Sequence, residues 1–125
     1  MKRVLVLTAI VFFAGCKKEP VSKPAPVIEI ITPTINQHFV MGETIHITGA
    51  ISSTVPLTEV AVHMTDLNTR IEFFHNHFSG GNQLLYSYDS FYPIPDNTKT
   101  SIKVEVEATD KEGTAAIKEI TITIN

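Results

Sequence analysis

One stretch decides the fold: Ile102-Lys103-Val104-Glu105-Val106-Glu107-Ala108, followed through Thr109 by Asp110-Lys111-Glu112-Gly113. Apolar and charged side chains alternate along it with a period of two, the pattern of a β-strand with one buried and one solvated face. The polar residues and the glycine mark a tight turn, beyond which the alternation returns at Ile120, Ile122 and Ile124. The segment therefore predicts two antiparallel strands with one face in water.

Similar alternation begins much earlier in the chain. Residues 27–31 are mostly apolar and β-branched and end at a proline, which predicts a first strand. In the next segment, Ile45 and Ile47 are expected to face the core, so that His46 points outward. No window of the sequence has the spacing of an amphipathic helix, and the pattern therefore predicts an all-β protein.

A hairpin is predicted in the middle of the chain. Val60, Val62 and Met64 alternate inward, which assigns His63 to the opposite, outer face. The sequence Asp66-Leu67-Asn68-Thr69 has the composition of a turn, so the following strand is expected to lie alongside the first.

The strand after this turn is expected to be short. Over residues 70–74, Ile71 and Phe73 are predicted to pack inward, after which residues 75–82 are predicted to form an exposed loop, because Gly80-Gly81-Asn82 disfavours a strand. Residues 84–92 then predict an aromatic strand.

About seven short strands separated by turns fit a sandwich of two sheets. Three segments, residues 28–33, 42–49 and above all 104–113, resemble immunoglobulin-like or cadherin-like modules of bacterial surface proteins, in which a strand ending Ala-x-Asp meets a Gly turn. The resemblance implies an immunoglobulin-like β-sandwich over residues 27–125. The sequence lacks the buried Trp and the disulfide pair of antibody domains, and such a fold says little about function.

The N-terminus has the pattern of an export signal. Lys2 and Arg3 precede an apolar run over residues 4–14, and Ala14-Gly15 supplies the small residues that a signal peptidase requires. The run is about half of the ~20 residues that a bilayer-spanning helix needs, which favours a cleaved signal over residues 1–15.

Phe13-Ala14-Gly15-Cys16 resembles the lipobox of bacterial lipoproteins, although Phe13 replaces the usual leucine. The resemblance implies lipidation of Cys16 and membrane attachment through that lipid, with the Pro-rich residues 16–26 as a flexible tether. Lys17 after the cysteine resembles the sorting signal for the outer membrane, and the charged residues resemble lipoproteins of Bacteroidota-type bacteria, facing the periplasm or the exterior. The alternative is an ordinary secretory signal with a chance cysteine.

Composition restricts the partners of the domain. The chain has 10 basic and 13 acidic residues, and Lys2 and Arg3 lie in the signal, so residues 16–125 carry a formal charge of −5. This balance argues against a nucleic-acid partner, which requires clustered basic residues. Cys16 is the one cysteine of the sequence, so no disulfide can form within the chain.

Histidines offer a candidate metal site. His75 and His77 have the i, i+2 spacing that places two imidazoles on one strand face, and neutral imidazole binds Zn²⁺ or Cu²⁺. His63 is the best third ligand and Glu72 is close in sequence. The alternation of side chains along a strand argues against this site. If Phe73 faces the core, His75, two residues later, is also expected to face inward, whereas His63 is expected to face outward. The alternative is a set of exposed histidines without a ligand.

Acidic and aromatic side chains offer two further candidate sites. Asp110, Glu112, Glu105 and Glu107 suggest calcium by resemblance to cadherin-like modules, whereas a turn aspartate and a solvated strand face explain them more simply. The aromatic side chains between positions 73 and 92 are expected to fill the core in part and to leave a stripe for a protein or glycan.

No enzyme motif is present in the sequence, since no Gly-x-Ser-x-Gly or phosphate-binding glycine loop occurs. The sequence therefore predicts a non-enzymatic, lipid-anchored interaction or accessory module of the cell envelope with an envelope protein or glycan as partner. A histidine-based metal-binding lipoprotein and a structural lipoprotein without a ligand are the alternatives.

Overall fold

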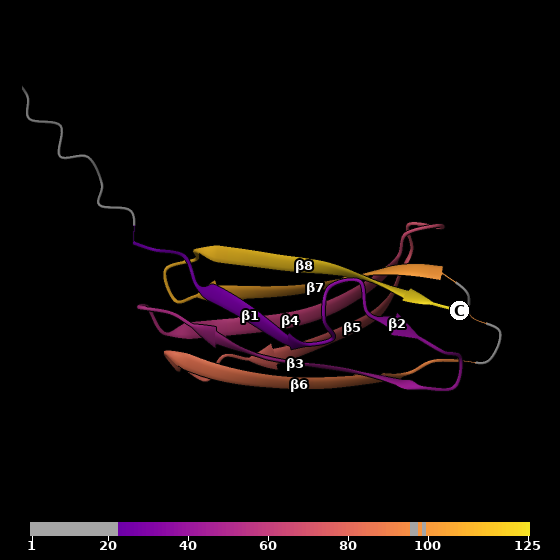
Figure 1. The fold of residues 1–125 in the computed structure, drawn as a ribbon. Coiled ribbons are helices and arrows are strands. Elements are labelled where there is room, and N and C mark those ends of the chain that lie inside the picture. Colours follow the sequence, from indigo (N-terminus) through magenta and orange to yellow (C-terminus); the bar gives the residue numbers. More distant parts are fainter. Residues whose placement is uncertain (1–22, 96–97, 99) are drawn as a thin grey trace, which may run out of the picture.

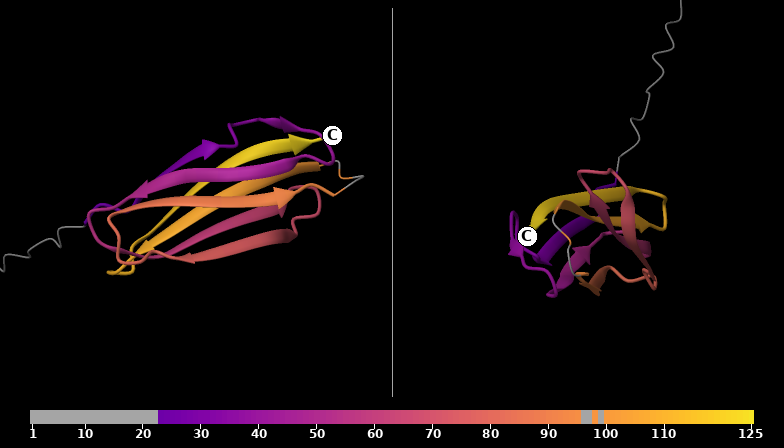
Figure 2. Two further views of the ribbon diagram at one scale, coloured as in Figure 1. Left: turned by 90° about the horizontal axis from the view of Figure 1, so that it is seen from below. Right: turned by 90° about the vertical axis from the view of Figure 1, so that its right-hand side faces the viewer.

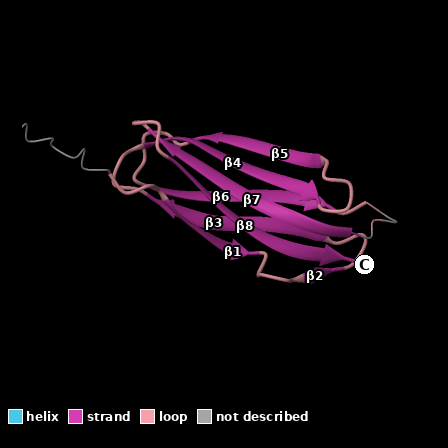
Figure 3. Cartoon of the chain, turned by 90° about the horizontal axis from the view of Figure 1, so that it is seen from above, coloured by secondary structure: helices cyan, strands magenta, loops and turns pink. Residues whose placement is uncertain are grey.

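The computed structural model describes residues 23–95, 98 and 100–125. Within these residues the chain forms strands and no helix (Figure 1; Figure 3). The strands are β1 (Val27–Thr32), β2 (His38–Phe39), β3 (Thr44–Ser52), β4 (Leu57–Asp66), β5 (Glu72–Ser79), β6 (Leu85–Pro93), β7 (Thr100–Asp110) and β8 (Ala115–Ile124). The predicted signal, Cys16 and the first part of the tether lie outside the described residues.

The strands form two sheets that lie face to face (Figure 2). The smaller sheet has the order β1-β3-β6, and the larger has the order β2-β8-β7-β4-β5. All pairs are antiparallel except β2 with β8, where His38 and Phe39 run parallel to the end of the chain. The two-residue strand β2 was not predicted, whereas the other seven strands correspond to predicted ones.

The core lies between the sheets and consists of the inward positions of the alternating strands. It contains Ile28, Phe39, Ile45, Ile47, Ile51, Leu57, Val60, Val62, Met64, Tyr88, Ile94, Ile102, Val104, Val106, Ala108, Ile120, Ile122 and Ile124. The predicted inward faces of β3, β4, β7 and β8 are thus confirmed. Because aliphatic side chains of β-branched residues dominate, the sheets pack closely without a disulfide.

The absence of a side chain at Gly49 lets the Tyr88 side chain of the neighbouring strand lie against the backbone. A Cβ atom at this position would overlap the hydroxyl of Tyr88 and the backbone carbonyl of Glu29. The Tyr88 hydroxyl donates a 2.7 Å hydrogen bond to that carbonyl. Its burial raises the pKa of Tyr88 well above the ordinary value for tyrosine, and the nearby charge of Glu29 adds to the effect.

The turn after β7 has the predicted form. The buried carboxylate of Asp110 accepts hydrogen bonds through Oδ1 from the backbone N–H groups of Glu112, at 2.9 Å, and Thr114, at 3.0 Å. The predicted hairpin turn is also present, since the Arg70 N–H donates to the Asp66 carbonyl at 2.7 Å. Both aspartates fix the backbone of the turn in which they lie.

The prediction for the segment after Asp66 was wrong in two respects. Residues 75–79 continue β5 and do not form a loop, because their register with β4 is unbroken from Phe74 to Ser79. A register shift between Met64 and Thr65 places the extra residue Phe73 in β5, and this bulge reverses the parity assumed from the sequence. Phe74 packs against the core, while Ile71 is 63% exposed.

Candidate functional site

The bulge brings the predicted metal ligands to one face. Opposite His63 on β4, the register pairs His75 of β5 on one side and Glu105 of β7 on the other. All three residues occupy positions that alternate with core residues, so their side chains lie on the outer face of the larger sheet. The predicted conflict of parity between His63 and His75 therefore does not occur.

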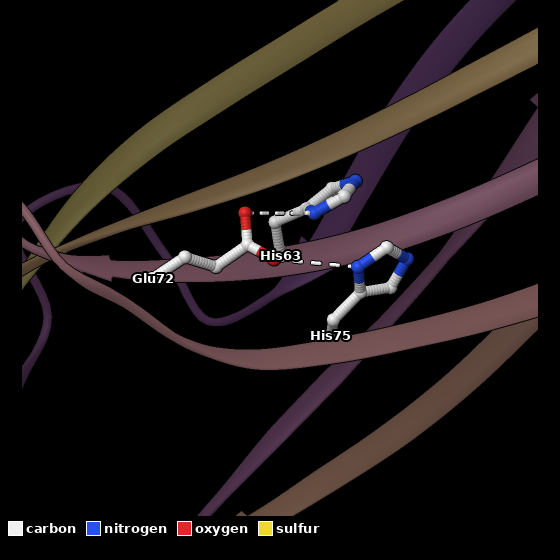
Figure 4. Close-up of side chains that lie close together, drawn as sticks. All are labelled: His63, Glu72 and His75. Atoms are coloured by element: carbon white, nitrogen blue, oxygen red, sulfur yellow. Dashed lines mark ion pairs between the residues drawn. The ribbon is translucent and has the colours of Figure 1, made fainter.

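Glu72 connects the two histidines (Figure 4). One carboxylate oxygen, Oε2, lies 3.2 Å from Nδ1 of His63, and the other, Oε1, lies 3.3 Å from Nδ1 of His75. The two imidazole rings are 4.3 Å apart between centroids and tilted by 55°. One ligand atom from each of the three residues lies within 4.8 Å of the other two.

His63 is the least exposed member of this group. Its side chain is 15% exposed, whereas those of Glu72 and His75 are 45% and 50% exposed. Despite the short approach of Glu72, the contact lacks the geometry of a hydrogen bond, and both ring nitrogens of His63 are buried without a hydrogen-bond partner among the described residues. A buried polar group without a partner is costly, and such a cost is often retained at a functional site.

His77 lies two residues beyond His75 on β5. Its ring centroid is 6.3 Å from that of His75, and its Nε2 lies 3.9 Å from a carboxylate oxygen of Glu59. His77 also lines a groove of about 140 Å³ together with His63, His75 and Glu107. The predicted set of three histidines is therefore gathered on one face, with His63 and His75 adjacent and His77 beside them.

A second group of ligands shares His63. Ligand atoms of His63, Glu105 and Glu107 lie within 4.8 Å of one another. Glu105 also contacts Lys103 at 3.1 Å, and this hydrogen bond raises the pKa of the Lys103 ammonium. From the sequence, Glu105 and Glu107 were best explained as a solvated strand face. Their position beside His63 follows from the pairing of β4 with β7, which the sequence pattern does not reveal.

The other two histidines and Asp110 lie away from this group. His46 is exposed on β3 of the other sheet, as expected, and His38 contacts Thr123 and Asn125 at 3.0 and 3.1 Å. Asp110 holds its turn together, as the simpler of its two interpretations requires.

The aromatic residues do not form a continuous exposed stripe in the described part of the chain. Tyr88 is buried, and Phe74, Phe78, Tyr86 and Tyr92 pack against the core. Phe91, at 64% exposure, lies on β6 of the smaller sheet, whereas Phe73, at 37%, lies on β5 of the larger sheet and contacts Tyr92. Most of the aromatic side chains therefore serve the core.

The donor atoms of His63, Glu72 and His75 suit a divalent transition metal. Zn²⁺ takes imidazole nitrogen and carboxylate oxygen at about 2.0–2.2 Å in a tetrahedron, whose corners stand about 3.3 Å apart. One ligand atom from each residue lies within 4.8 Å of the other two, and each histidine Nδ1 lies 3.2–3.3 Å from a different oxygen of Glu72, so small side-chain movements would bring three donors to that spacing. Three protein ligands leave the fourth position open to water or to a ligand of another molecule.

Comparisons with known proteins inform the fold alone. The sequence matches no protein-family model and no curated protein. Among solved structures, the chain is similar to a Niemann-Pick type C2 protein from the Japanese carpenter ant, with a TM-score of 0.52 and 9% identity over 86% of this chain and 98% of that chain. The fold is an immunoglobulin-like β-sandwich, as predicted. No helix of the described residues is both long and apolar enough to cross a bilayer.

Proposed function

We propose that this protein is a non-enzymatic accessory module of the cell envelope with a site for a divalent transition-metal ion, Zn²⁺ or Cu²⁺, formed by His63, Glu72 and His75. The observation that carries the proposal is the pair of contacts from the two carboxylate oxygens of Glu72 to the Nδ1 atoms of His63 and His75 (Figure 4). Both histidines offer the nitrogen that faces the carboxylate, and Glu72 supplies one negative charge against the cation.

The burial of His63 supports this assignment over that of a surface histidine. A histidine retained for solubility would expose its nitrogens to water, whereas both nitrogens of His63 are buried without a hydrogen-bond partner among the described residues. A metal ion would satisfy one of them and remove the cost of leaving it unpaired.

The lipid anchor is part of the same proposal. Residues 13–16 resemble a lipobox, and the described Lys23 pairs with Glu112 in the turn between β7 and β8. That turn and the start of β1 lie at the end of the sandwich opposite the C-terminus (Figure 1). The Pro-rich segment would therefore attach the domain to the outer membrane by one end and leave the His63 face of the sheet accessible from the side.

Anchoring has its own test. Replacement of Cys16 by Ser is expected to abolish labelling by a fatty-acid probe and to remove the protein from the outer-membrane fraction, because the thiol that accepts the lipid is absent. A Ser22→Ala variant is the control and is expected to be labelled normally. Outer-membrane association of the Cys16→Ser protein at the wild-type level would refute lipid anchoring.

Metal binding is tested by calorimetric titration of the Cys16→Ser chain in mild detergent with Zn²⁺ and Cu²⁺. This background removes the one thiol, so binding reports the histidines and carboxylates. A His63→Ala, His75→Ala double variant is expected to lose saturable high-affinity binding. The His46→Ala variant is expected to bind as the parent does, because His46 lies on the other sheet.

Either of two results contradicts the proposal. The parent chain does not bind either ion, or the double variant binds as tightly as the parent. Each result would favour the interaction module without a metal, whose partner is an envelope protein or glycan.

A further inference from the structure

We propose that His63 bridges two metal ions, the first held with Glu72 and His75 and the second with Glu105 and Glu107. The inference rests on the proposed metal-binding function and adds a second site that shares one ligand with the first. It concerns the number of ions that the face binds and the way in which they are connected.

The two ligand groups meet at His63 because β4 lies between β5 and β7. Across one side of β4, His63 is paired with His75, and across the other it is paired with Glu105. Each group brings three ligand atoms within 4.8 Å of one another, and His63 belongs to both. A central strand can present one side chain to neighbours on both sides, as His63 does here.

The two nitrogens of the His63 ring face different neighbours. Nδ1 lies 3.2 Å from Glu72, and Nε2 lies on the far side of the ring from that carboxylate (Figure 4). The proposal assigns Nδ1 to the ion held with Glu72 and His75, and Nε2 to the ion held with Glu105 and Glu107. Neither nitrogen has a hydrogen-bond partner among the described residues, so the described protein atoms do not compete with a metal at either position.

A groove borders the second site on the side of His63 and Glu107. His63 and Glu107 line this groove on the outer face of the sheet. Ala61 and Glu59 line it as well, and the side chain of Ala61 is only a methyl group. Glu105 holds one oxygen, Oε2, against Lys103 at 3.1 Å, and the proposal assigns its other oxygen to the ion. His77 and Glu59, whose Nε2 and Oε2 atoms lie 3.9 Å apart, line the same groove.

The charges of the ligands offset those of two divalent cations, apart from the positive charge that Lys103 places beside Glu105. Two such ions bring four positive charges, while Glu72, Glu105 and Glu107 supply three negative charges. Neutral imidazole carries one proton on one of its two nitrogens. When the second ion binds, that proton leaves to solvent, the new nitrogen-to-metal bond takes its place, and the His63 ring supplies the fourth negative charge.

The experiment is a titration of the Cys16→Ser chain with Cu²⁺, followed by electron paramagnetic resonance and calorimetry. Two equivalents are expected to bind. The signal is expected to grow over the first equivalent and to fall over the second, because an imidazolate bridge couples the two unpaired spins antiferromagnetically. A Glu105→Gln, Glu107→Gln variant is expected to bind one equivalent with an uncoupled signal.

Glu119→Gln is the matched control, because Glu119 lies opposite Glu105 on β8, contacts Lys103 at 3.8 Å and belongs to neither ligand group. It is expected to bind two coupled ions. Folding of each variant is checked by its thermal transition, and the resonance titration of the Cys16→Ser parent chain tests the bridge even if a ligand variant does not fold.

The outcomes separate the two proposals. Two equivalents with spin coupling support the bridge. One equivalent, or two with independent signals, overturns the bridge and leaves a single site at His63, Glu72 and His75 intact. No saturable binding overturns both proposals.

Discussion

Replacement of His63 by Leu is expected to stabilise the metal-free domain and to abolish metal binding. His63 occupies an outer-face position that is largely covered by its neighbours, with a side chain 15% exposed. Its two ring nitrogens are buried without a hydrogen-bond partner among the described residues. Leucine has a similar size, fills the same space and has no polar atom to desolvate.

The magnitude follows from the burial of these atoms. Leaving a buried donor or acceptor unsatisfied costs about 1–3 kcal/mol. Partial exposure of the ring and the approach of Glu72 at 3.2 Å reduce this cost, so the gain for His63→Leu is expected to be about 1–2 kcal/mol in the free energy of unfolding. For a domain of this size, each kcal/mol corresponds to a rise of roughly 4–8 °C in Tm.

The assay is urea and thermal unfolding in the presence of a chelator, repeated with saturating Zn²⁺. The metal is expected to raise the Tm of the wild type, because it binds the folded state, and to leave that of His63→Leu unchanged. His46→Leu, an exposed substitution on the other sheet, is expected to change stability by less than about 0.5 kcal/mol. A metal-free His63→Leu domain less stable than the wild type would refute the reasoning, since it would mean that the imidazole contributes to the fold.

Three further predictions concern the stability of the fold. Gly49→Ala is expected to lower the free energy of unfolding by about 2–4 kcal/mol in urea titrations, because the new methyl overlaps the Glu29 carbonyl and displaces the Tyr88 hydroxyl; additivity with Tyr88→Phe would contradict this. The raised pKa of Tyr88 means that the folded state favours the protonated phenol, so stability is retained below pH ~10 and declines above it, and Tyr88→Phe is expected to reduce that alkaline decline in pH-dependent melts. Asp110→Ala is expected to lower the free energy of unfolding by about 2 kcal/mol in the same urea titrations, because the N–H groups of Glu112 and Thr114 lose their acceptor. An unchanged urea midpoint would contradict this, since it would show that water replaces the carboxylate.

The architecture was predictable from the sequence because one face of each long strand is buried. The alternation over residues 102–108 assigns Val104 and Val106 to the core, and both are fully buried. The same argument holds for Ile45 and Ile47. The parallel strand β2 was not predictable, because two residues are too few to show a period and their pairing with the end of the chain is long-range.

The site was predictable in its residue types and not in its geometry. The spacing of His75 and His77 identified two candidate ligands, and His63 was identified from the hairpin. The position of Glu72 depends on the bulge at Phe73, which the sequence does not mark with a glycine or another turn residue. Because a shift of one residue moves every side chain of a strand to the other face, this one local irregularity decides whether the ligands meet.

The arrangement also explains how a metal site can occur on this fold without disturbing its core. Each proposed ligand is next in sequence to a residue that faces the opposite way: His63 lies between Val62 and Met64, and Glu105 lies between Val104 and Val106. Changes on the outer face therefore leave the buried face intact, and the same sandwich can carry or lack the ligands. For this reason the similarity to another immunoglobulin-like structure identifies the frame, while the function has to be argued from the outer face of β4, β5 and β7.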